Sequence, residues 1–177
     1  MKSDIVLINN SGMGFENAVI QSKKAAAYEG LDDLQTIHLQ VLTEEMLSLA
    51  RSITGQMDAS FWIELENGRA DLHMTTKAVL DREKRAQLIH TATSRKNESA
   101  KTFLGKIRDR FEEAMAADPV YDCPPEDVLA DLPHGVFGEP EWDGYERSIL
   151  RKLADEIRIG IHGGVVEITV SRNFQAK

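Results

Sequence analysis

The chain has a single cysteine, Cys123, among its 177 residues. No disulfide can form within it, and we expect a protein of the reducing cytoplasm. It also lacks any apolar run near the roughly 20 residues that span a bilayer. Its first ten residues, MKSDIVLINN, lack the basic start and long apolar core of a signal peptide. We therefore expect a cytoplasmic protein with no membrane association.

An excess of positive charge is also missing. The formal net charge is −8 and the pI is near 5.1. Binding to nucleic acid or to an anionic membrane needs a basic face, so this balance argues against both. The 42% hydrophobic content is that of a globular protein. Residues 1–177 are enough for one well-buried domain, which is the organisation we expect.

Proline is missing from most of the chain, because all five prolines lie between Pro119 and Pro140. The stretch 117–146 also has no lysine or arginine and carries nine acidic residues. This composition predicts an acidic, Pro-rich segment over 117–143 that is either a long loop or is partly disordered until a binding partner orders it. A solvated surface loop is the favoured interpretation, and a lid or a partner-binding segment is the alternative.

The longest helical pattern covers residues 34–54, LQTIHLQVLTEEMLSLARSIT. At 3.6 residues per turn, one stripe contains Ile37, Val41, Glu44 and Ser48. Leu34, Leu42 and Leu49 widen it into an apolar arc, with Glu45 inside the arc and Glu44 at its edge. A carboxylate on a core-facing stripe costs several kcal/mol unless water, a metal ion, a ligand or a backbone donor meets it. Two partly exposed glutamates at the rim of the arc are the alternative.

Shorter patterns surround this helix. Turn signals at Asn67-Gly68 and Gly163-Gly164 predict two hairpins. We expect strands over residues 4–9, 59–66, 70–76, 156–162 and 165–171. The helix before the long one is expected to end at Gly30. The long helix then begins with Asp32 or Asp33 as its N-cap. Further helices are expected over residues 15–28, from the Asp81 cap to residue 92, and over 100–117 and 145–155.

This order of elements resembles the GHKL (histidine-kinase-like) ATPase superfamily, and in detail the anti-sigma-factor serine kinases and anti-sigma regulatory factors of bacterial partner-switching systems. Three stretches carry the resemblance. LTEEMLSLARSIT stands where that family has its N-box helix. The hairpin from Phe61 to Thr76 precedes the first glycine box, and LADEIRIGIHGGVVEITV matches the last helix and hairpin. The resemblance covers residues 4–80 and 142–172, and residues 81–141 correspond to the variable ATP lid.

The two hairpins and the first strand predict an antiparallel or mixed sheet of about five strands with helices on one face, which is an α+β two-layer sandwich. The resemblance implies the Bergerat type, with a mixed sheet. It also implies a nucleotide site. An N-box Glu orients water toward the γ-phosphate, and an Asn four residues later holds Mg²⁺. An Asp bonds the adenine amino group, and a glycine-rich box wraps the phosphates. In this chain the roles fall on Glu44 as catalytic residue, Ser48 for the metal, and Asp81 and Gly144 for the nucleotide.

The sequence departs from the family pattern at each box. Ser48 stands where the Asn is expected, and pairing the motif with Glu45 instead places Leu49, which cannot bind a metal, at that position. Where Asp-x-Gly-x-Gly is expected the chain reads TTKAVLD, and Asp81 sits at a predicted helix cap. Only Gly144 remains of the second box, too little for a side-chain-free phosphate cradle. We expect no cofactor, with ATP and Mg²⁺ as the alternative.

Two functions are compatible with these residues and this resemblance. The first is a regulatory protein, degenerate in nucleotide binding, that acts by binding a sigma-factor-like or antagonist-like protein or a second copy of itself. The alternative is an ATP-dependent protein serine/threonine kinase of the anti-sigma-factor type. The five histidines show no metal-ligand spacing. The basic residues Arg82, Lys84, Arg85, Arg95, Lys96 and Lys101 suggest a solvated helix face, or a contact with phosphates, with an acidic partner or with the acidic loop.

Overall fold

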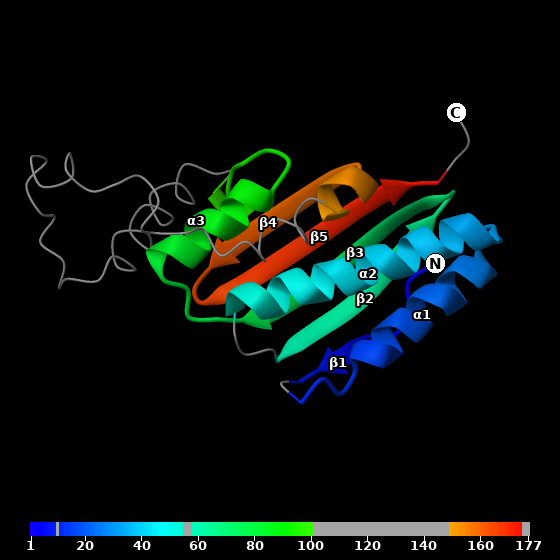
Figure 1. Ribbon diagram of the computed structural model, residues 1–177, viewed down its shortest axis with the longest axis horizontal. Coiled ribbons are helices and arrows are strands. Elements are labelled where there is room, and N and C mark those ends of the chain that lie inside the picture. Colours follow the sequence, from blue (N-terminus) through cyan, green and yellow to red (C-terminus); the bar gives the residue numbers. More distant parts are fainter. Residues whose placement is uncertain (10, 55–57, 101–148, 175–177) are drawn as a thin grey trace, which may run out of the picture.

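The structure is a computed structural model that describes residues 1–9, 11–54, 58–100 and 149–174 (Figure 1). Residues 149–153 are helical. The expected helix over 100–117, the acidic loop 117–143, Gly144 and most of the lid-like region 81–141 lie outside the described residues. The elements in chain order are β1 Val6–Ile8, α1 Phe15–Tyr28, α2 Asp33–Thr54, β2 Ala59–Glu66, β3 Arg69–Lys77, α3 Arg82–Thr91, the 3₁₀ turn η1 Glu98–Ala100, β4 Glu156–His162 and β5 Val165–Asn173.

The five strands form one sheet in the order β1-β2-β3-β5-β4. Each neighbouring pair in it is antiparallel. The expectation of a mixed sheet was therefore wrong for the described strands, although the α+β class and the strand number are confirmed. A parallel pair is usually made by a crossover with one helix, whereas a pair of helices, α1 and α2, separates β1 from β2. The second helix, α2, returns the chain to the end of the sheet at which β1 finishes. β2 therefore starts at that end and runs antiparallel to β1.

One face of the sheet is covered by helices, as expected (Figure 1). The strands alternate buried and half-exposed residues, so every second side chain enters the core between the layers. From α3, Leu88 belongs to the same core. Fully buried members of this core include Leu39, Leu42, Met46, Phe61, Ile63, Leu65, Leu72, Met74, Leu88, Ile159, Ile168 and Val170.

Both hairpin turns form at the predicted dipeptides. Asn67 and Gly68 have φ values of 51° and 76°, and Gly163 and Gly164 have 56° and 73°. Two successive positive φ values define the type I′ turn, whose twist matches that of the flanking strands. Because a two-residue turn fixes the register of its strands, Glu66 pairs with Arg69 and every pair beyond it follows.

The helix ends also follow the sequence. Gln35 donates its backbone N–H to Asp32 Oδ1 (2.8 Å), and Asp32 donates its own N–H to Gln35 Oε1 (3.1 Å), so Asp32 is the cap of α2. At the end of α1, Gly30 has a φ of 71°, and Leu31 N donates to Ala26 O (3.0 Å). This is a Schellman ending, in which glycine adopts the left-handed conformation without strain.

The predicted core stripe of α2 was wrong. Ile37 is 54% exposed and Leu34 is 62% exposed, while Glu44 is exposed and Ser48 half-buried. The buried face of α2 carries Leu39, Leu42, Met46 and Ala50, each with an exposed fraction of 0%, so of the predicted arc only Leu42 and Leu49 (1% exposed) are in the core. The chain offers apolar residues on both sides of this helix, and packing on the sheet and α1 selects one of them. Among the described helices, none combines the length and apolarity of a membrane span.

Candidate functional site

The residues predicted from the resemblance do not share a cavity or a hydrogen bond within the described part of the chain. Glu44 lies on the exposed side of α2 and Ser48 is half-buried one turn later. Asp81 caps α3, where its Oδ1 accepts the Lys84 N–H (2.7 Å). Gly144 lies outside the described residues. The catalytic, metal and nucleotide roles of these residues therefore stay predictions.

Of the two adjacent glutamates, Glu45 is the partly buried one. Its side chain is half-buried and its Oε2 is inaccessible to solvent. By helix geometry Glu45 lies on the flank of α2 opposite Thr43, which contacts Ser22 of α1. The residue four positions after Glu45 is Leu49, which is 1% exposed and has no oxygen in its side chain. This pair does not provide the two oxygen ligands that the family pattern places on one helix face.

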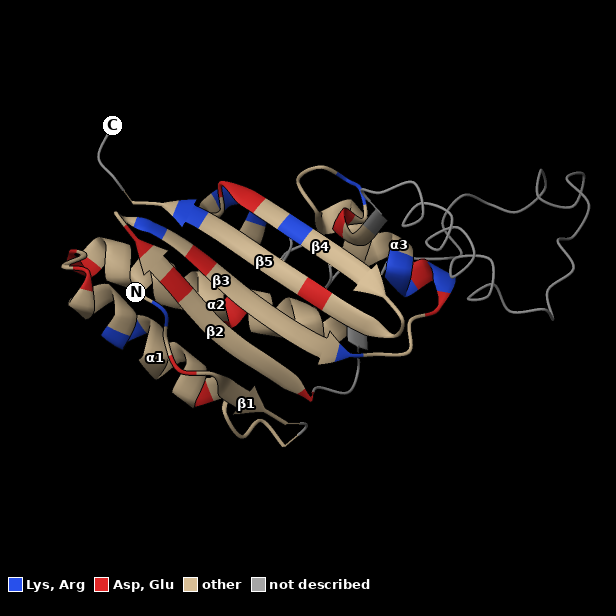
Figure 2. Ribbon diagram, turned by 180° about the vertical axis from the view of Figure 1, so that it is seen from behind, with Lys and Arg blue, Asp and Glu red and all other residues tan. Residues whose placement is uncertain are grey.

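The sheet face opposite α1 and α2, which we call the open face, is uncovered by the described helices (Figure 2). Across its middle, the strand register aligns Trp62 of β2, His73 of β3, Thr169 of β5 and Arg158 of β4. The rings of Trp62 and His73 stack with centroids 5.0 Å apart and an interplanar angle of 11°. Thr169 Oγ1 lies 3.3 Å from His73 Nδ1. This row gives the open face a rigid aromatic centre.

A pair of charged groups holds one side of the aromatic stack. Lys2 Nζ lies 5.3 Å from the Trp62 ring centroid and donates to Glu64 Oε1 (2.9 Å). This hydrogen bond is the main reason that the pKa of Glu64 lies below its ordinary value. Burial lowers the pKa of His73 below its ordinary value, although the Glu64 carboxylate, 3.8 Å from Nε2, acts in the opposite direction. The stack therefore contains a neutral imidazole at neutral pH.

The next row of the open face contains a second polar group. Asp71 accepts hydrogen bonds from the Ser171 hydroxyl and from Arg69, whose guanidinium also lies 3.8 Å from Glu156. Burial acts to raise the pKa of Asp71, but the hydrogen bonds from Ser171 and Arg69 outweigh it and hold the pKa below its ordinary value. The carboxylate is thus ionised and held in one orientation.

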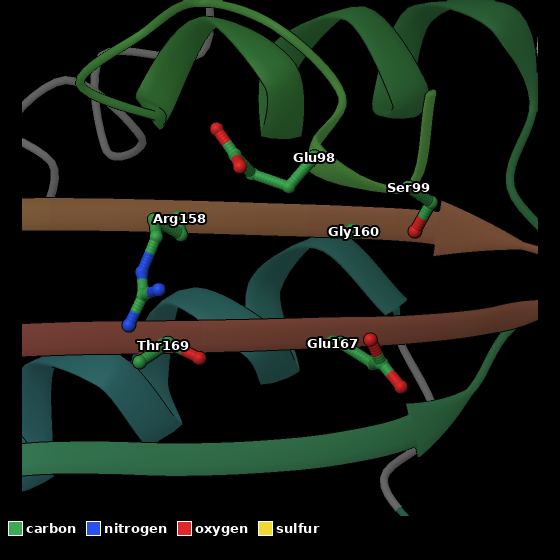
Figure 3. Close-up of a pocket in the computed structure, with 6 residues that line it drawn as sticks. All are labelled: Glu98, Ser99, Arg158, Gly160, Glu167 and Thr169. Carbon is green, nitrogen blue, oxygen red and sulfur yellow. The ribbon is translucent and has the colours of Figure 1, made fainter. Parts of the chain in front are cut away.

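A cavity of about 280 Å³ opens on this face beside the outer strand (Figure 3). Arg158 extends from β4 toward β5, where Thr169 and Glu167 lie, and Glu98 and Ser99 border the cavity from the segment beyond β4. At Gly160 the wall is tight, because a Cβ there would lie 2.7 Å from Ser99 Oγ. The lining is mostly polar and carries both signs of charge.

The described residues assemble neither a metal site nor a nucleophilic triad. Among the described residues, no group of three or more His, Cys, Asp or Glu side chains is placed to hold a metal ion. The Ser99 hydroxyl lies 3.3 Å from His162 Nδ1, but the described hydrogen bonds include no acid that would orient the imidazole, as a nucleophilic triad needs. An array of oriented polar side chains around an aromatic pair is instead suited to contact another macromolecule.

Part of this surface could have been predicted from the sequence alone. The alternation of β2 places Trp62 and Glu64 on the polar face, and the Asn67-Gly68 turn pairs Trp62 with His73. That pairing was missed because His73 was weighed as a metal ligand or as a surface or satisfied histidine, and its partner across the hairpin was not considered. The neighbours Thr169 and Arg158 join the row through the β3–β5 pairing, and no local sequence signal specifies contacts between strands so far apart.

The described fold and this surface define a two-layer α+β protein with an antiparallel sheet, one face of which the described helices leave uncovered. No protein-family model matches the chain, and a search of curated proteins finds no match. Among solved structures, its fold is similar to that of a chain in the crystal structure of the SiaB–SiaC complex from Pseudomonas aeruginosa. The TM-score is 0.50 with 10% sequence identity, covering 97% of this chain and 88% of that chain. At this identity, the similarity concerns the fold.

Proposed function

We propose that this chain is a regulatory protein with a histidine-kinase-like ATPase fold that has lost ordinary MgATP binding and acts by binding another protein. The observation that carries the proposal is the open face, with its stacked Trp62 and His73 beside two fixed charge clusters, Lys2–Glu64 and Arg69–Asp71. Aromatic and arginine side chains held rigid on a surface are the usual anchors of protein interfaces. The structural neighbour was crystallised as a complex of two proteins, which is compatible with this kind of function.

The departures from the family's nucleotide-binding motifs support the loss of nucleotide binding. Phosphoryl transfer depends on metal-bridged phosphates held in position by the protein. This chain offers Ser48 in place of an amide ligand, and it uses the Asp81 carboxylate to cap α3. The alternative function, an ATP-dependent protein serine/threonine kinase, would use Glu44 as the water-orienting or basic residue. That alternative needs phosphate contacts from outside the described residues.

A crosslinking experiment tests the binding function. A photo-crosslinking amino acid replaces Glu167, an exposed residue of the open face, or, as the matched control, Lys24, an exposed residue of α1. After irradiation in cells that produce the protein, we expect a discrete adduct from position 167 that disappears when Trp62→Ala is added. Position 24 should give none. An adduct of twice the chain mass would identify a second copy as the partner.

Adducts from position 24 but not from position 167 would overturn the assignment of the open face. The kinase alternative is tested with the partner identified in this way and with γ-labelled ATP. We expect no transfer of label. Transfer that is lost in the folded Glu44→Ala variant would establish the kinase and overturn the proposal.

A further inference from the structure

A second surface, separate from the open face, lies where α3 ends beside the outer edge of β4. The segment 93–97 closes this edge. Thr93 donates its N–H to Ile157 O (2.9 Å), and its Oγ1 accepts the Ile157 N–H (2.8 Å). Asn97 binds both backbone groups of Ile161 in the same way, at 2.9 and 2.8 Å. Two anchors therefore hold the turn between them in a fixed position.

Arg95 occupies that turn in a left-handed conformation, with a φ of 52°. Glycine and asparagine adopt this conformation more readily than arginine does. The Arg95 side chain is exposed and lines a cavity of about 260 Å³ together with Arg151, Ala154 and Asp155. A side chain kept in an unfavourable backbone conformation, at a cavity that it lines, points to a use for its guanidinium.

The cavity has an apolar part and two arginines. Ala92 and Ile157, which also line it, are 0% and 2% exposed. Its one carboxylate, Asp155, is already engaged, because it accepts from Arg172 (3.0 Å) and from the backbone N–H of Asn173 (2.7 Å). Arg151 donates to the His90 carbonyl, which anchors its side chain at the end of α3. In the described part of the structure, no carboxylate lies within ion-pair distance of either cavity arginine.

The surroundings of the cavity carry the same sign of charge. Residues 82–96 contain four exposed or half-exposed basic residues, Arg82, Lys84, Arg95 and Lys96, and one exposed acidic residue, Glu83. Figure 2 shows this basic cluster on α3 and the loop after it. In a chain with a net charge of −8, a local excess of positive charge attracts acidic partners. Planar guanidinium groups are also suited to bind carboxylates in a bidentate manner.

We propose that this cavity binds an acidic segment of a partner protein, with one carboxylate entering between Arg95 and Arg151 and further acidic side chains lying along α3. The partner is defined by this chemistry, as a run of aspartate and glutamate residues in an extended or loop conformation. The site is distinct from the open face, so it stands or fails independently of the proposed function.

The test uses the full chain and a fluorescein-labelled octaglutamate peptide, followed by fluorescence anisotropy. We expect saturable binding at about 0.05 M salt that weakens strongly at about 0.3 M. Arg95→Gly should weaken binding about tenfold. Glycine suits the left-handed backbone at this position, and circular dichroism checks that the variant is folded. Arg151→Gln should weaken binding to a similar extent, with folding checked by circular dichroism.

Lys152→Gln is the matched control. Lys152 is exposed on the same helical turn as Arg151 and does not line the cavity, so its removal changes the net charge equally and should alter affinity less than about twofold. Equal losses in Lys152→Gln and Arg95→Gly would overturn the proposal in favour of a diffuse charge effect. Absence of binding at low salt, or equal binding of an octalysine peptide, would also overturn it.

The chain's own acidic stretch is the competing occupant. If the intact chain does not bind the peptide, but a variant with this stretch neutralised to Asn and Gln does, the proposal of a separate partner is overturned. The residues changed in that variant are Asp118, Asp122, Glu126, Asp127, Asp131, Glu139, Glu141, Asp143 and Glu146.

Discussion

The two faces of the sheet are built from alternate residues of the same strands, but one face packs against the helices and the other presents polar and aromatic side chains at the surface. On the covered face Phe61, Ile63 and Leu72 are 0% exposed and pack against the helices. On the open face the neighbouring residues Trp62 and His73 are half-buried and are fixed by stacking and hydrogen bonds. Adjacent residues in the sequence are therefore expected to separate stability from binding, and substitutions at neighbouring positions can test this separation.

The largest effect should come from Phe61→Ala compared with Trp62→Ala. Removing the fully buried Phe61 ring should lower the free energy of unfolding by about 3–5 kcal/mol. Trp62→Ala should lower it by about 1 kcal/mol, because a half-buried ring loses little more than its stacking on His73 and its contact with Lys2. Urea denaturation of the two variants measures both values. Losses of equal size would remove the distinction between the faces.

A smaller effect is expected between α1 and α2, where two buried hydroxyls form a bonded pair. The Ser22 and Thr43 hydroxyls lie 2.6 Å apart and near the carbonyls of Ala18 and Leu39. Ser22→Ala and Thr43→Val should each cost about 1 kcal/mol, and the double variant should cost less than their sum. A double-mutant cycle in urea provides the check, and strict additivity would mean that the two hydroxyls act independently.

The open face should respond to pH where the covered face does not. Since the pKa of His73 is lowered in the folded state, the unfolded chain binds more protons as the pH falls below about 6.5. Stability should therefore decrease between pH 7 and pH 5, and His73→Gln should flatten this dependence. His90→Gln, at an exposed position of α3, is the control and should keep the wild-type slope. An unchanged slope in His73→Gln would rule out this contribution.

The smallest expected effect has the opposite sign. Arg95→Gly relieves a left-handed arginine, worth about 1–2 kcal/mol, but gives the unfolded chain about 0.5–1 kcal/mol of extra entropy. The net gain in stability should be about 0.5 kcal/mol, measured by urea denaturation. A loss of more than this amount would show that the Arg95 side chain stabilises the fold, and would separate its role from that of a surface binding residue.

Much of the fold followed from local signals. The turns at Asn67-Gly68 and Gly163-Gly164 and the caps at Asp32 and Asp81 formed where the sequence predicts them. These signals are local, since a positive φ or a capping oxygen depends on a few neighbouring residues. The bounds of α1, β2 and β4 agree with the predicted ranges for the same reason.

Features that depend on contacts between distant parts of the chain could not be predicted from such local signals. The buried side of α2 was misassigned because Ile37 and Val41 offer one apolar stripe and Leu42 and Met46 another, and only packing on α1 and the sheet decides between them. The mixed sheet was wrong because strand direction depends on how many helices lie between strands. Within the candidate site, the pairing of Trp62 with His73 could have been predicted from the hairpin turn alone. The position of Arg158 in the same row could not, because it depends on the β3–β5 and β4–β5 pairings.

Isothermal titration of MgATP into the folded chain tests the central claim most directly. The proposed function predicts no binding heat at concentrations up to the millimolar range, because Ser48 and the helix-capping Asp81 stand where the resemblance places the nucleotide and metal ligands. Micromolar binding that disappears in Glu44→Ala or Ser48→Ala would contradict the account and restore these residues to a nucleotide site.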